Sequence, residues 1–361
     1  MTRARDSQID LSQTPWYHLV NRCVRRAFLC GVDSISGRNY EHRKPWIEQR
    51  MMQLASIFAI DVAAFAVMSN HYHLVVRVNQ ARAEGWSMDE VLTQWTQLFA
   101  APKLVQDYLA DAPMDQGSRQ RVSELAEIYR ERLMDISWYM RVLNESIARF
   151  ANQEDEVKGR FWEGRFKSQA LLDEQAVLAA MAYVDLNPVR ANIARELLDS
   201  DFTSVQRRLQ GVYHYESTPV ALETPPGLVQ REVKTQENAD SAFVRPFLQR
   251  LEKIPTAPLL AFDETGLVEA AIPCAATDYL EYVDFLGRAV HPNKLGVMDE
   301  NLPPLMQRLG LDDKHIEAFA QGGWLNKFGG AVGQVVHLKD FQASSPLQFV
   351  KGQNMARRLF G

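Results

Sequence analysis

The chain has 361 residues and a formal net charge of −5 at pH 7, with 46% hydrophobic and 24% charged residues. This length is enough for one large or two medium domains with a buried core, and the composition is ordinary for a soluble globular protein. No apolar run is long enough to cross a bilayer, and residues 1–10 lack the apolar segment of a signal peptide. The three cysteines, Cys23, Cys30 and Cys274, have neither metal nor disulfide spacing, so we expect them to pack in the core of a cytoplasmic protein with no membrane partner.

Alternating and helical periods predict four elements before residue 80. We expect a strand over residues 16–26, a helix over residues 41–60, and strands over residues 61–68 and 71–78 that flank a short Ser-Asn turn.

Two histidines begin the third of these strands. Residues i and i+2 of a strand point to the same face, so His71 and His73 would project together and Tyr72 would pack on the opposite face. Neutral imidazole is a common ligand for divalent metals, so this pair could form half of a metal site. The alternative is two polar side chains on a solvated sheet face.

Residues 80–157 are predicted to be a helical insertion, with helical period over residues 88–109 and 118–152 and aromatic residues in its core. A strand over residues 166–172 follows. The order βαββ and then βα is compatible with an α+β fold. Its antiparallel sheet would be of split β-α-β (ferredoxin-like) type, with helices on one face.

The helix after this strand carries another candidate. Asp173 is a suitable N-cap, and Pro188 favours a helix end near Asn187. Tyr183 and Asn187 stand four residues apart and therefore share one helix face. Taken alone, Tyr183 is most simply a half-buried core residue.

Charge is distributed unevenly along the chain. Residues 80–156 hold eight Lys and Arg against fourteen Asp and Glu, and residues 211–361 hold fourteen against eighteen. By contrast, residues 1–79 hold ten against six, and residues 157–210 hold eight against seven. The latter two segments, which hold the candidate histidines and Tyr183, are therefore the only ones that are not acidic, and a polyanion would be repelled least there.

Basic residues that could bind phosphate lie in both of these segments. Phe161, Trp162 and Phe166 interleave with the second group, a mixture that suits stacking on unpaired bases, although core packing explains each aromatic equally well. The candidate nucleic-acid contacts are Arg22, Arg25, Arg26, Lys158, Arg160, Trp162, Arg165 and Lys167.

Residues 212–240 contain several prolines in a polar stretch and predict a linker. Residues 241–361 would then form a mostly helical accessory domain. Within it, residues 302–320 predict two short helices that are faintly similar to a helix-turn-helix, although packing or partner binding is the simpler role.

Two of the segments together resemble a known family. The sequence NHYHL of residues 70–74, followed by Y-x-x-x-N-P-V-R-A over residues 183–191, resembles the single-tyrosine HUH transposases and, among them, the branch called REP-associated tyrosine transposases. Residues 16–22 (WYHLVNR) and 159–166 (GRFWEGRF) are similar to the same branch. The resemblance covers residues 13–210.

The resemblance implies a metal-dependent enzyme that nicks and transfers single-stranded or hairpin DNA, with an HUH-type catalytic domain over residues 1–211. Tyr183 would attack the scissile phosphate and form a 5′-phosphotyrosine link. His71 and His73 would bind a divalent metal, with Asn187 as the third ligand, and Arg190 would contact the nucleic acid. An amide oxygen suits Mg²⁺ and two imidazoles favour Mn²⁺, so either metal is possible. We expect no small-molecule cofactor, and a monomer or homodimer.

Two other functions stay open. One is a regulator that binds hairpin DNA and no longer cuts it, and the other is a metal-dependent phosphodiesterase that uses water instead of Tyr183. His18, as a structural polar residue, and Asp185, which lies on a different helix face from Tyr183, are left outside the expected site.

Overall fold

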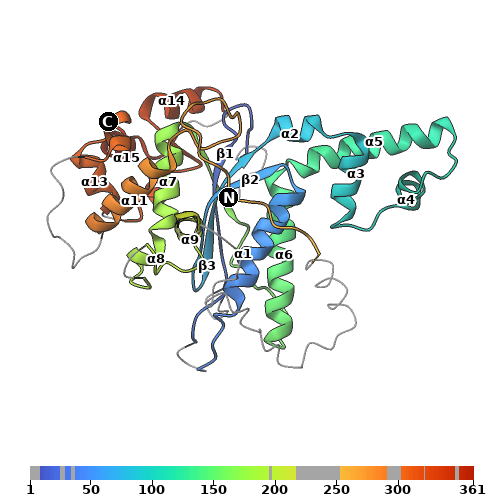
Figure 1. Cartoon of the computed structure of the whole chain (residues 1–361), viewed down its shortest axis with the longest axis horizontal. Coiled ribbons are helices and arrows are strands. Elements are labelled where there is room, and N and C mark those ends of the chain that lie inside the picture. Colours follow the sequence, from blue (N-terminus) through green and yellow to red (C-terminus); the bar gives the residue numbers. More distant parts are fainter. Residues whose placement is uncertain are drawn as a thin grey trace.

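A five-stranded sheet with the strand order β2-β3-β1-β4-β5 forms the centre of the molecule (Figure 1). The strands are β1 (Trp16–Arg22), β2 (Ile60–Val67), β3 (His71–Val78), β4 (Lys167–Leu171) and β5 (Ala331–Val332). This computed structural model describes residues 9–24, 29–33, 37–194, 197–216, 253–290, 302–320, 322–345 and 349–361.

The sheet has a split β-α-β topology. Helix α1 (Arg43–Ile57) joins β1 to β2, and β3 lies between these two strands and is antiparallel to both. β4 pairs with the other side of β1, also antiparallel, and β5 pairs with β4 in parallel. The predicted α+β fold class with an antiparallel sheet is therefore confirmed.

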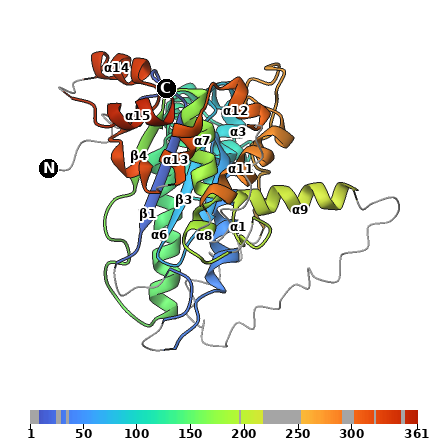
Figure 2. The same cartoon turned by 90° about the vertical axis from the view of Figure 1, so that its left-hand side faces the viewer.

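Helices cover both faces of the sheet, so the prediction of helices on one face was wrong. α1 and α6 (Ile136–Glu154) lie on one side of the strands, and α7 (Glu174–Asp185) lies on the other (Figure 1, Figure 2). The physical reason is in β2, where seven of the eight residues are buried. Apolar side chains on both faces of a strand require cover on both sides.

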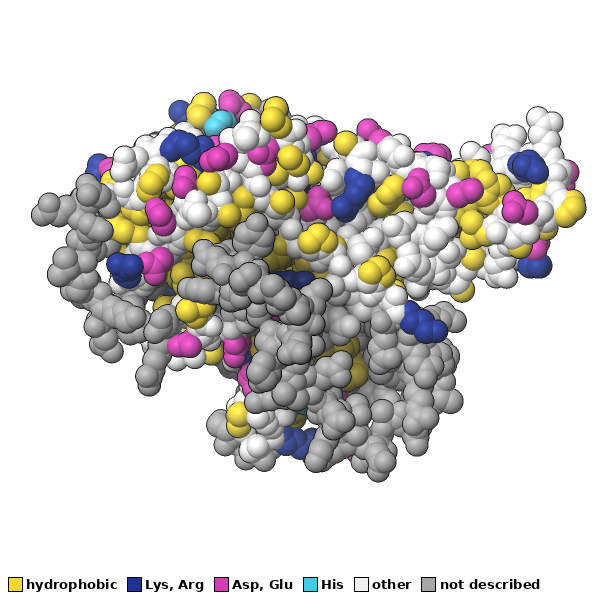
Figure 3. Space-filling view, in the orientation of Figure 1, with side chains coloured by type: hydrophobic (Ala, Val, Ile, Leu, Met, Phe, Trp, Pro, Cys, Tyr) yellow, Lys and Arg dark blue, Asp and Glu magenta, His cyan; other side chains and the backbone are white. Residues whose placement is uncertain are grey.

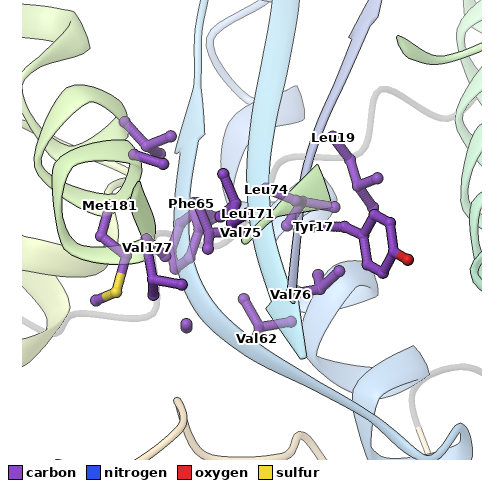
Figure 4. Close-up of a cluster of buried hydrophobic side chains, with 14 of the residues drawn as sticks. Tyr17, Leu19, Val62, Phe65, Leu74, Val75, Val76, Leu171, Val177 and Met181 are labelled. Atoms are coloured by element: carbon purple, nitrogen blue, oxygen red, sulfur yellow. The ribbon is translucent and has the colours of Figure 1, made fainter. Parts of the chain in front are cut away.

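The packing of both layers is visible in Figure 4. Tyr17 and Leu19 of β1 point to one side of the sheet, whereas Phe65 of β2 points to the side of Val177 and Met181 on α7. All five side chains are at most 3% exposed. Because each buried side chain of this size contributes about 1.5–3 kcal/mol, the apolar stripe of α7 fixes this helix firmly against the sheet.

The predicted helical insertion projects from the sheet as a separate arm (Figure 1). Acidic side chains are spread along the face of the arm that is visible in Figure 3. The rings of Trp95 and Tyr129 stack inside it at 4.8 Å. α6, predicted as part of the insertion, packs on α1, where Tyr139 Oη donates to Met51 O. The arm consists of α2 (Gln80–Gly85), α3 (Met88–Thr96), α4 (Lys103–Leu109) and α5 (Gln116–Leu133).

The C-terminal region is mostly helical, as expected, and it adds β5 to the same sheet. The two short helices predicted over residues 302–320 are α12 and α13. The predicted linker lies mostly within residues 217–252, outside the described residues, so the domain boundaries stay a prediction. The remaining elements are α8 (Asn187–Arg190), α9 (Ser204–Glu216), α11 (Ala276–Val290), α12 (Pro304–Arg308), α13 (Asp313–Ala320), η1 (Trp324–Lys327), α14 (Val335–Ala343) and α15 (Gln353–Leu359).

Cys23, Cys30 and Cys274 are buried and form no disulfide, in keeping with a packing role. Among the helices that the structure describes, none is both long enough and apolar enough to span a bilayer.

Candidate active site

The two histidines of β3 lie side by side on the face of the sheet that α7 covers. The ring centroids of His71 and His73 are 4.8 Å apart. Tyr72 points to the opposite face, where it is fully buried and its hydroxyl donates to Asn144 Oδ1 at 2.7 Å. This alternation follows from the two-residue period of a strand.

Tyr183 of α7 faces this histidine pair. Its half-buried ring lies 5.8 Å, centroid to centroid, from the ring of His73, in an edge-to-face arrangement. Asp173 caps the helix as predicted, because its side chain accepts a hydrogen bond from Ala176 N. The buried face of α7 thus orients the helix so that Tyr183 reaches the histidines.

His18 of β1 is a third histidine at this site, and it was left outside the predicted set. Its Nε2 lies within hydrogen-bonding distance of His73 Nδ1, at 2.9 Å, and the two rings meet edge to edge with their planes only 11° apart. β1 pairs with β3 so that His18 is opposite Val75, one step diagonal from His73. The sequence shows that His18 is in a strand, but only the strand pairing places it beside His73.

Gln169 of β4 continues the contacts of His18, and sequence reasoning missed it as well. Gln169 is opposite His18 in the β1–β4 pairing, and its Oε1 lies 3.1 Å from His18 Nδ1. Its Nε2 donates to the carbonyl oxygens of Leu325 and Gly329, each at 3.0 Å. An amide in a strand carries no signal of such a role.

Burial keeps the three histidines neutral. It lowers the pKa of His18 and of His71 to about 4, and it lowers the pKa of His73 well below the usual value. The positive charge of Arg22 also lowers the pKa of both His71 and His73. Neutral imidazole is the form that can bind a metal ion.

Arg190 lies against Tyr183 rather than at the surface. Its guanidinium carbon is 4.8 Å from the centre of the Tyr183 ring and 4.3 Å from that of Phe319, and its Nη2 donates to Phe319 O at 2.7 Å. Burial lowers the pKa of Arg190 to about 10. Burial also raises the pKa of Tyr183, and the charge of Arg190 opposes this rise. Arg190 is therefore placed to act on the tyrosine more directly than on a DNA backbone.

α7 ends at Asp185, close to the end predicted near Asn187, and Asn187 begins the separate short helix α8, one turn beyond Tyr183. Its side-chain Nδ2 is buried and has no hydrogen-bond partner among the described residues. A buried amide without a partner is costly unless it faces a ligand.

The ionisable side chains at this site supply only part of the ligands that a divalent metal needs. In the part of the chain that the structure describes, no three His, Cys, Asp or Glu side chains are close enough to hold a metal ion. The two neutral imidazoles are the donors that the structure brings together. Asn187 could add only its side-chain oxygen, since its Nδ2, which has no partner among the described residues, is a hydrogen-bond donor and cannot bind a metal. Within the same residues, His71 and His73 are engaged through Nδ1, with Asn70 Oδ1 and His18 Nε2 respectively. Their Nε2 atoms can therefore act as metal ligands.

Two of the predicted nucleic-acid contacts share the sheet face of the histidines. Arg22 is exposed and directly opposite His71, and Lys167 is exposed on β4, opposite Val20, which in turn is opposite His73. Antiparallel partners point to the same face, so these two cations flank the site.

The other predicted contacts lie elsewhere. Trp162 packs on Tyr72, on the far face of the sheet, and its Nε1 donates to Asn144 O. Arg160 donates to the carbonyl oxygens of Trp162 and Glu163 and so braces its own loop. Phe161 and Phe166 are buried, Lys158 and Arg165 are exposed, and Arg25 and Arg26 lie outside the described residues.

Asp185 has a structural role away from the site. It is fully buried, and it accepts hydrogen bonds from Ser204 Oγ, Val205 N and Tyr279 Oη. It therefore holds the start of α9 and the helix α11 to the end of α7.

No protein-family model matches the chain, and no curated protein matches it either. Among solved structures, the chain is similar to one titled "Structure of the REP associates tyrosine transposase bound to a REP hairpin". The sequence identity is 12%, the match covers 62% of this chain and 96% of that chain, and the TM-score is 0.35. Likeness at this level decides neither the family nor the function of the chain.

Proposed function

We propose that this protein cuts and rejoins single-stranded or hairpin DNA with Tyr183 as its nucleophile. The observation that supports this function best is the meeting of Tyr183 with His73 and His71 on one face of the sheet, although α7 and β3 are far apart in the sequence. A tyrosine ring beside a pair of neutral imidazoles supports a hydroxyl nucleophile that acts next to a metal ion.

His71 and His73 would hold the metal, Mg²⁺ or Mn²⁺, and Asn187 is the proposed third ligand. The metal, when bound, polarises the scissile phosphate and offsets the negative charge that develops in the transition state.

The covalent step balances without a further reactant. The Tyr183 oxygen forms a bond to phosphorus, and the bond from phosphorus to the 3′ oxygen breaks. The phenol proton passes to solvent, and the departing 3′ oxygen takes up a proton. The products are a 5′-phosphotyrosine and a free 3′-hydroxyl, and attack by another 3′-hydroxyl reverses the step on a new strand.

The remaining residues act by charge. Arg190 stabilises the phenolate form of Tyr183, because it is a cation held against the ring. Arg22 and Lys167 would bind the phosphates on either side of the cut. The ring of Tyr183 lies between its own helix, α7, and the sheet. The DNA strand must therefore bend to bring the scissile phosphate to this ring, and an unpaired strand bends more readily than a duplex.

One observation favours the second candidate, a hairpin-binding regulator that does not cut. Trp324 packs edge-to-face against Tyr183 at 5.7 Å, and burial raises the pKa of this tyrosine. A half-buried, protonated tyrosine is a poor nucleophile, so this arrangement alone also suits a binding protein.

Covalent trapping separates the two functions. The full chain is mixed with end-labelled DNA hairpins that carry single-stranded flanks, with Mn²⁺ or Mg²⁺, and is resolved on a denaturing gel. We expect a metal-dependent protein–DNA adduct that Tyr183→Phe and the double variant His71→Ala/His73→Ala do not form, although both still bind the hairpin.

Each other outcome points elsewhere. Cutting without an adduct, retained in Tyr183→Phe, supports the phosphodiesterase that uses water. Hairpin binding with no cutting in either metal supports the regulator and contradicts the proposal.

A further inference from the structure

We propose that His18 and Gln169 are positioning residues that hold His73 in a single tautomer, with its Nε2 free of a proton. This inference rests on the metal-dependent function proposed above, because only a metal uses that nitrogen. The tautomer itself, however, is a property of the metal-free protein and can be measured without any reaction.

Gln169, His18 and His73 form a series of hydrogen-bonded side chains. The C-terminal region fixes the orientation of its first member, the amide of Gln169. Gln169 Nε2 lies 3.0 Å from both Leu325 O and Gly329 O. Carbonyl oxygens only accept hydrogen bonds, so the amide nitrogen must face them, and the amide oxygen must face the other way. The orientation of a side-chain amide is often ambiguous, but the two carbonyl acceptors decide it for Gln169.

His18 follows from Gln169. The oxygen Oε1 of Gln169 lies 3.1 Å from His18 Nδ1 and can only accept, so His18 carries a proton on Nδ1. A neutral imidazole with its proton on Nδ1 has a bare Nε2, which accepts hydrogen bonds.

His73 follows from His18. The bare Nε2 of His18 lies 2.9 Å from His73 Nδ1, so His73 must donate from Nδ1 and its own Nε2 is bare. A reversed Gln169 amide would run the same series backwards and leave a proton on His73 Nε2, a form that cannot bind a metal.

The geometry is held rigidly. His73 and His18 are 5% and 2% exposed, and their rings are nearly coplanar, with planes 11° apart and centroids 5.2 Å apart, as a direct hydrogen bond between ring nitrogens requires. Hydrogen bonds in such a buried setting are strong and specific, because water does not compete for them. His71 is independent of this series, since its Nδ1 meets Asn70 Oδ1 instead.

One consequence is a role for the C-terminal region in the chemistry of the site. None of its side chains belongs to the series, yet two of its backbone carbonyls set the direction of every hydrogen bond in it. The parallel pairing of β5 with β4 holds this segment beside Gln169.

The first test measures protons directly. Metal-free full chain, labelled with ¹⁵N in its histidines, is examined by two-bond ¹H–¹⁵N correlation NMR, and His18→Leu and His73→Ala assign the signals. We expect His18 and His73 to carry their protons on Nδ1. In Gln169→Leu, which leaves both rings in place, we expect mixed tautomers at His73.

The second test measures affinity for Mn²⁺ alone, from the electron paramagnetic resonance signal of free Mn²⁺, without DNA. His18→Leu removes the acceptor for His73 Nδ1 and should weaken binding by about tenfold or more. His18→Gln is the matched control, because its side-chain oxygen can accept that hydrogen bond, and it should bind Mn²⁺ as the wild type does. Thermal unfolding of each variant checks that the fold persists.

The outcomes are distinguishable from those for the proposed function. A proton on Nε2 of His73 in the wild type overturns the inference, whatever the metal affinity. The expected tautomer together with unchanged Mn²⁺ affinity in both His18→Leu and Gln169→Leu overturns the positioning role. If the wild-type protein binds neither Mn²⁺ nor Mg²⁺, the metal-dependent function is overturned. The role of His18 and Gln169 in positioning a metal ligand is then overturned too, even where the tautomer is as expected.

Discussion

The guanidinium group of Arg190 is held between the rings of Tyr183 and Phe319, 4.8 Å and 4.3 Å from their centres. Phe319 belongs to the C-terminal region, so this region sets the position of a cation against the proposed nucleophile. The Nε and Nη1 atoms of Arg190 are buried and lack partners among the described residues, which leaves the positive charge little compensated. An uncompensated buried cation favours the anionic form of its neighbour.

Replacing Arg190 should therefore slow the covalent step. Arg190→Met keeps the packing between the two rings but removes the charge, and we expect adduct formation to fall by about tenfold or more, on the scale of one charge in a desolvated site. Arg190→Lys keeps a charge without the planar stacking and should be intermediate. Single-turnover adduct formation measures the rates. Equal rates for the Met and Lys variants would show that the charge is unimportant.

Binding of DNA should depend on Arg22 and Lys167. If each contacts one phosphate, Arg22→Ala and Lys167→Ala should each lower the slope of log K against log salt concentration by about 1. Arg121→Ala is a suitable control, since Arg121 is exposed on the acidic arm and pairs with Glu124. Hairpin affinity is measured from 50 to 200 mM salt. If the salt slope falls equally in the control, the sheet face that carries Arg22 and Lys167 is not a specific binding surface for DNA.

Trp324 should be a major contributor to stability. It is fully buried and contacts Tyr183, Phe319 and Phe328. Trp324→Ala should lower the free energy of unfolding by about 3–5 kcal/mol. Trp324→Phe should cost only about 1–2 kcal/mol, because it keeps ring contacts and removes a buried N–H that has no partner among the described residues. Urea unfolding measures both, and similar losses would contradict this assignment of contacts.

Asp173 should tie the C-terminal region to the tyrosine helix. Its Oδ1 accepts from Ala176 N, and its Oδ2 accepts from Gln334 N at 2.7 Å and meets His337 Nδ1 at 2.8 Å. Asp173→Ala loses the helix cap and leaves Gln334 N unsatisfied, so we expect a loss of about 2–4 kcal/mol. Asp173→Asn keeps the cap and should lose less. Limited proteolysis is the second measurement, with faster cleavage near β5 expected only in the Ala variant.

His315 predicts a dependence of stability on pH. Burial lowers its pKa to about 4, and its ring contacts Tyr282 Oη and Leu359 O. The folded pKa lies below the unfolded value near 6.5, so the unfolded chain takes up the proton first as pH falls. Stability is therefore complete above about pH 6.5 and is lost progressively down to about pH 4, by about 2 kcal/mol at pH 5.

The comparison with His315→Gln isolates this contribution from the other buried histidines. The variant should be less stable at pH 7, yet it should lose about 2 kcal/mol less than the wild type between pH 7 and pH 5. Urea unfolding at the two pH values provides the measurement. Parallel losses in the two proteins would mean that folding does not lower the pKa of His315.

Local sequence patterns were sufficient for the elements that carry the candidate site. The alternation around His71 and His73 determined that both point to one face, and Asp173 with the stripe of Val177 and Met181 determined the helix of Tyr183. These signals are reliable because strand and helix periods depend on neighbours a few residues away.

Only the tertiary structure showed that His18, Gln169 and Trp324 lie at the candidate site. Each stands next to the site because of a pairing or packing between distant segments, and no property of its near neighbours in the chain indicates that pairing. The same holds for Arg190: the resemblance implied a contact with nucleic acid, and only the fold shows its packing between Tyr183 and Phe319. Which face of the sheet each helix covers was decided by the burial of β2 on both sides, a property of the assembled layers rather than of any one segment.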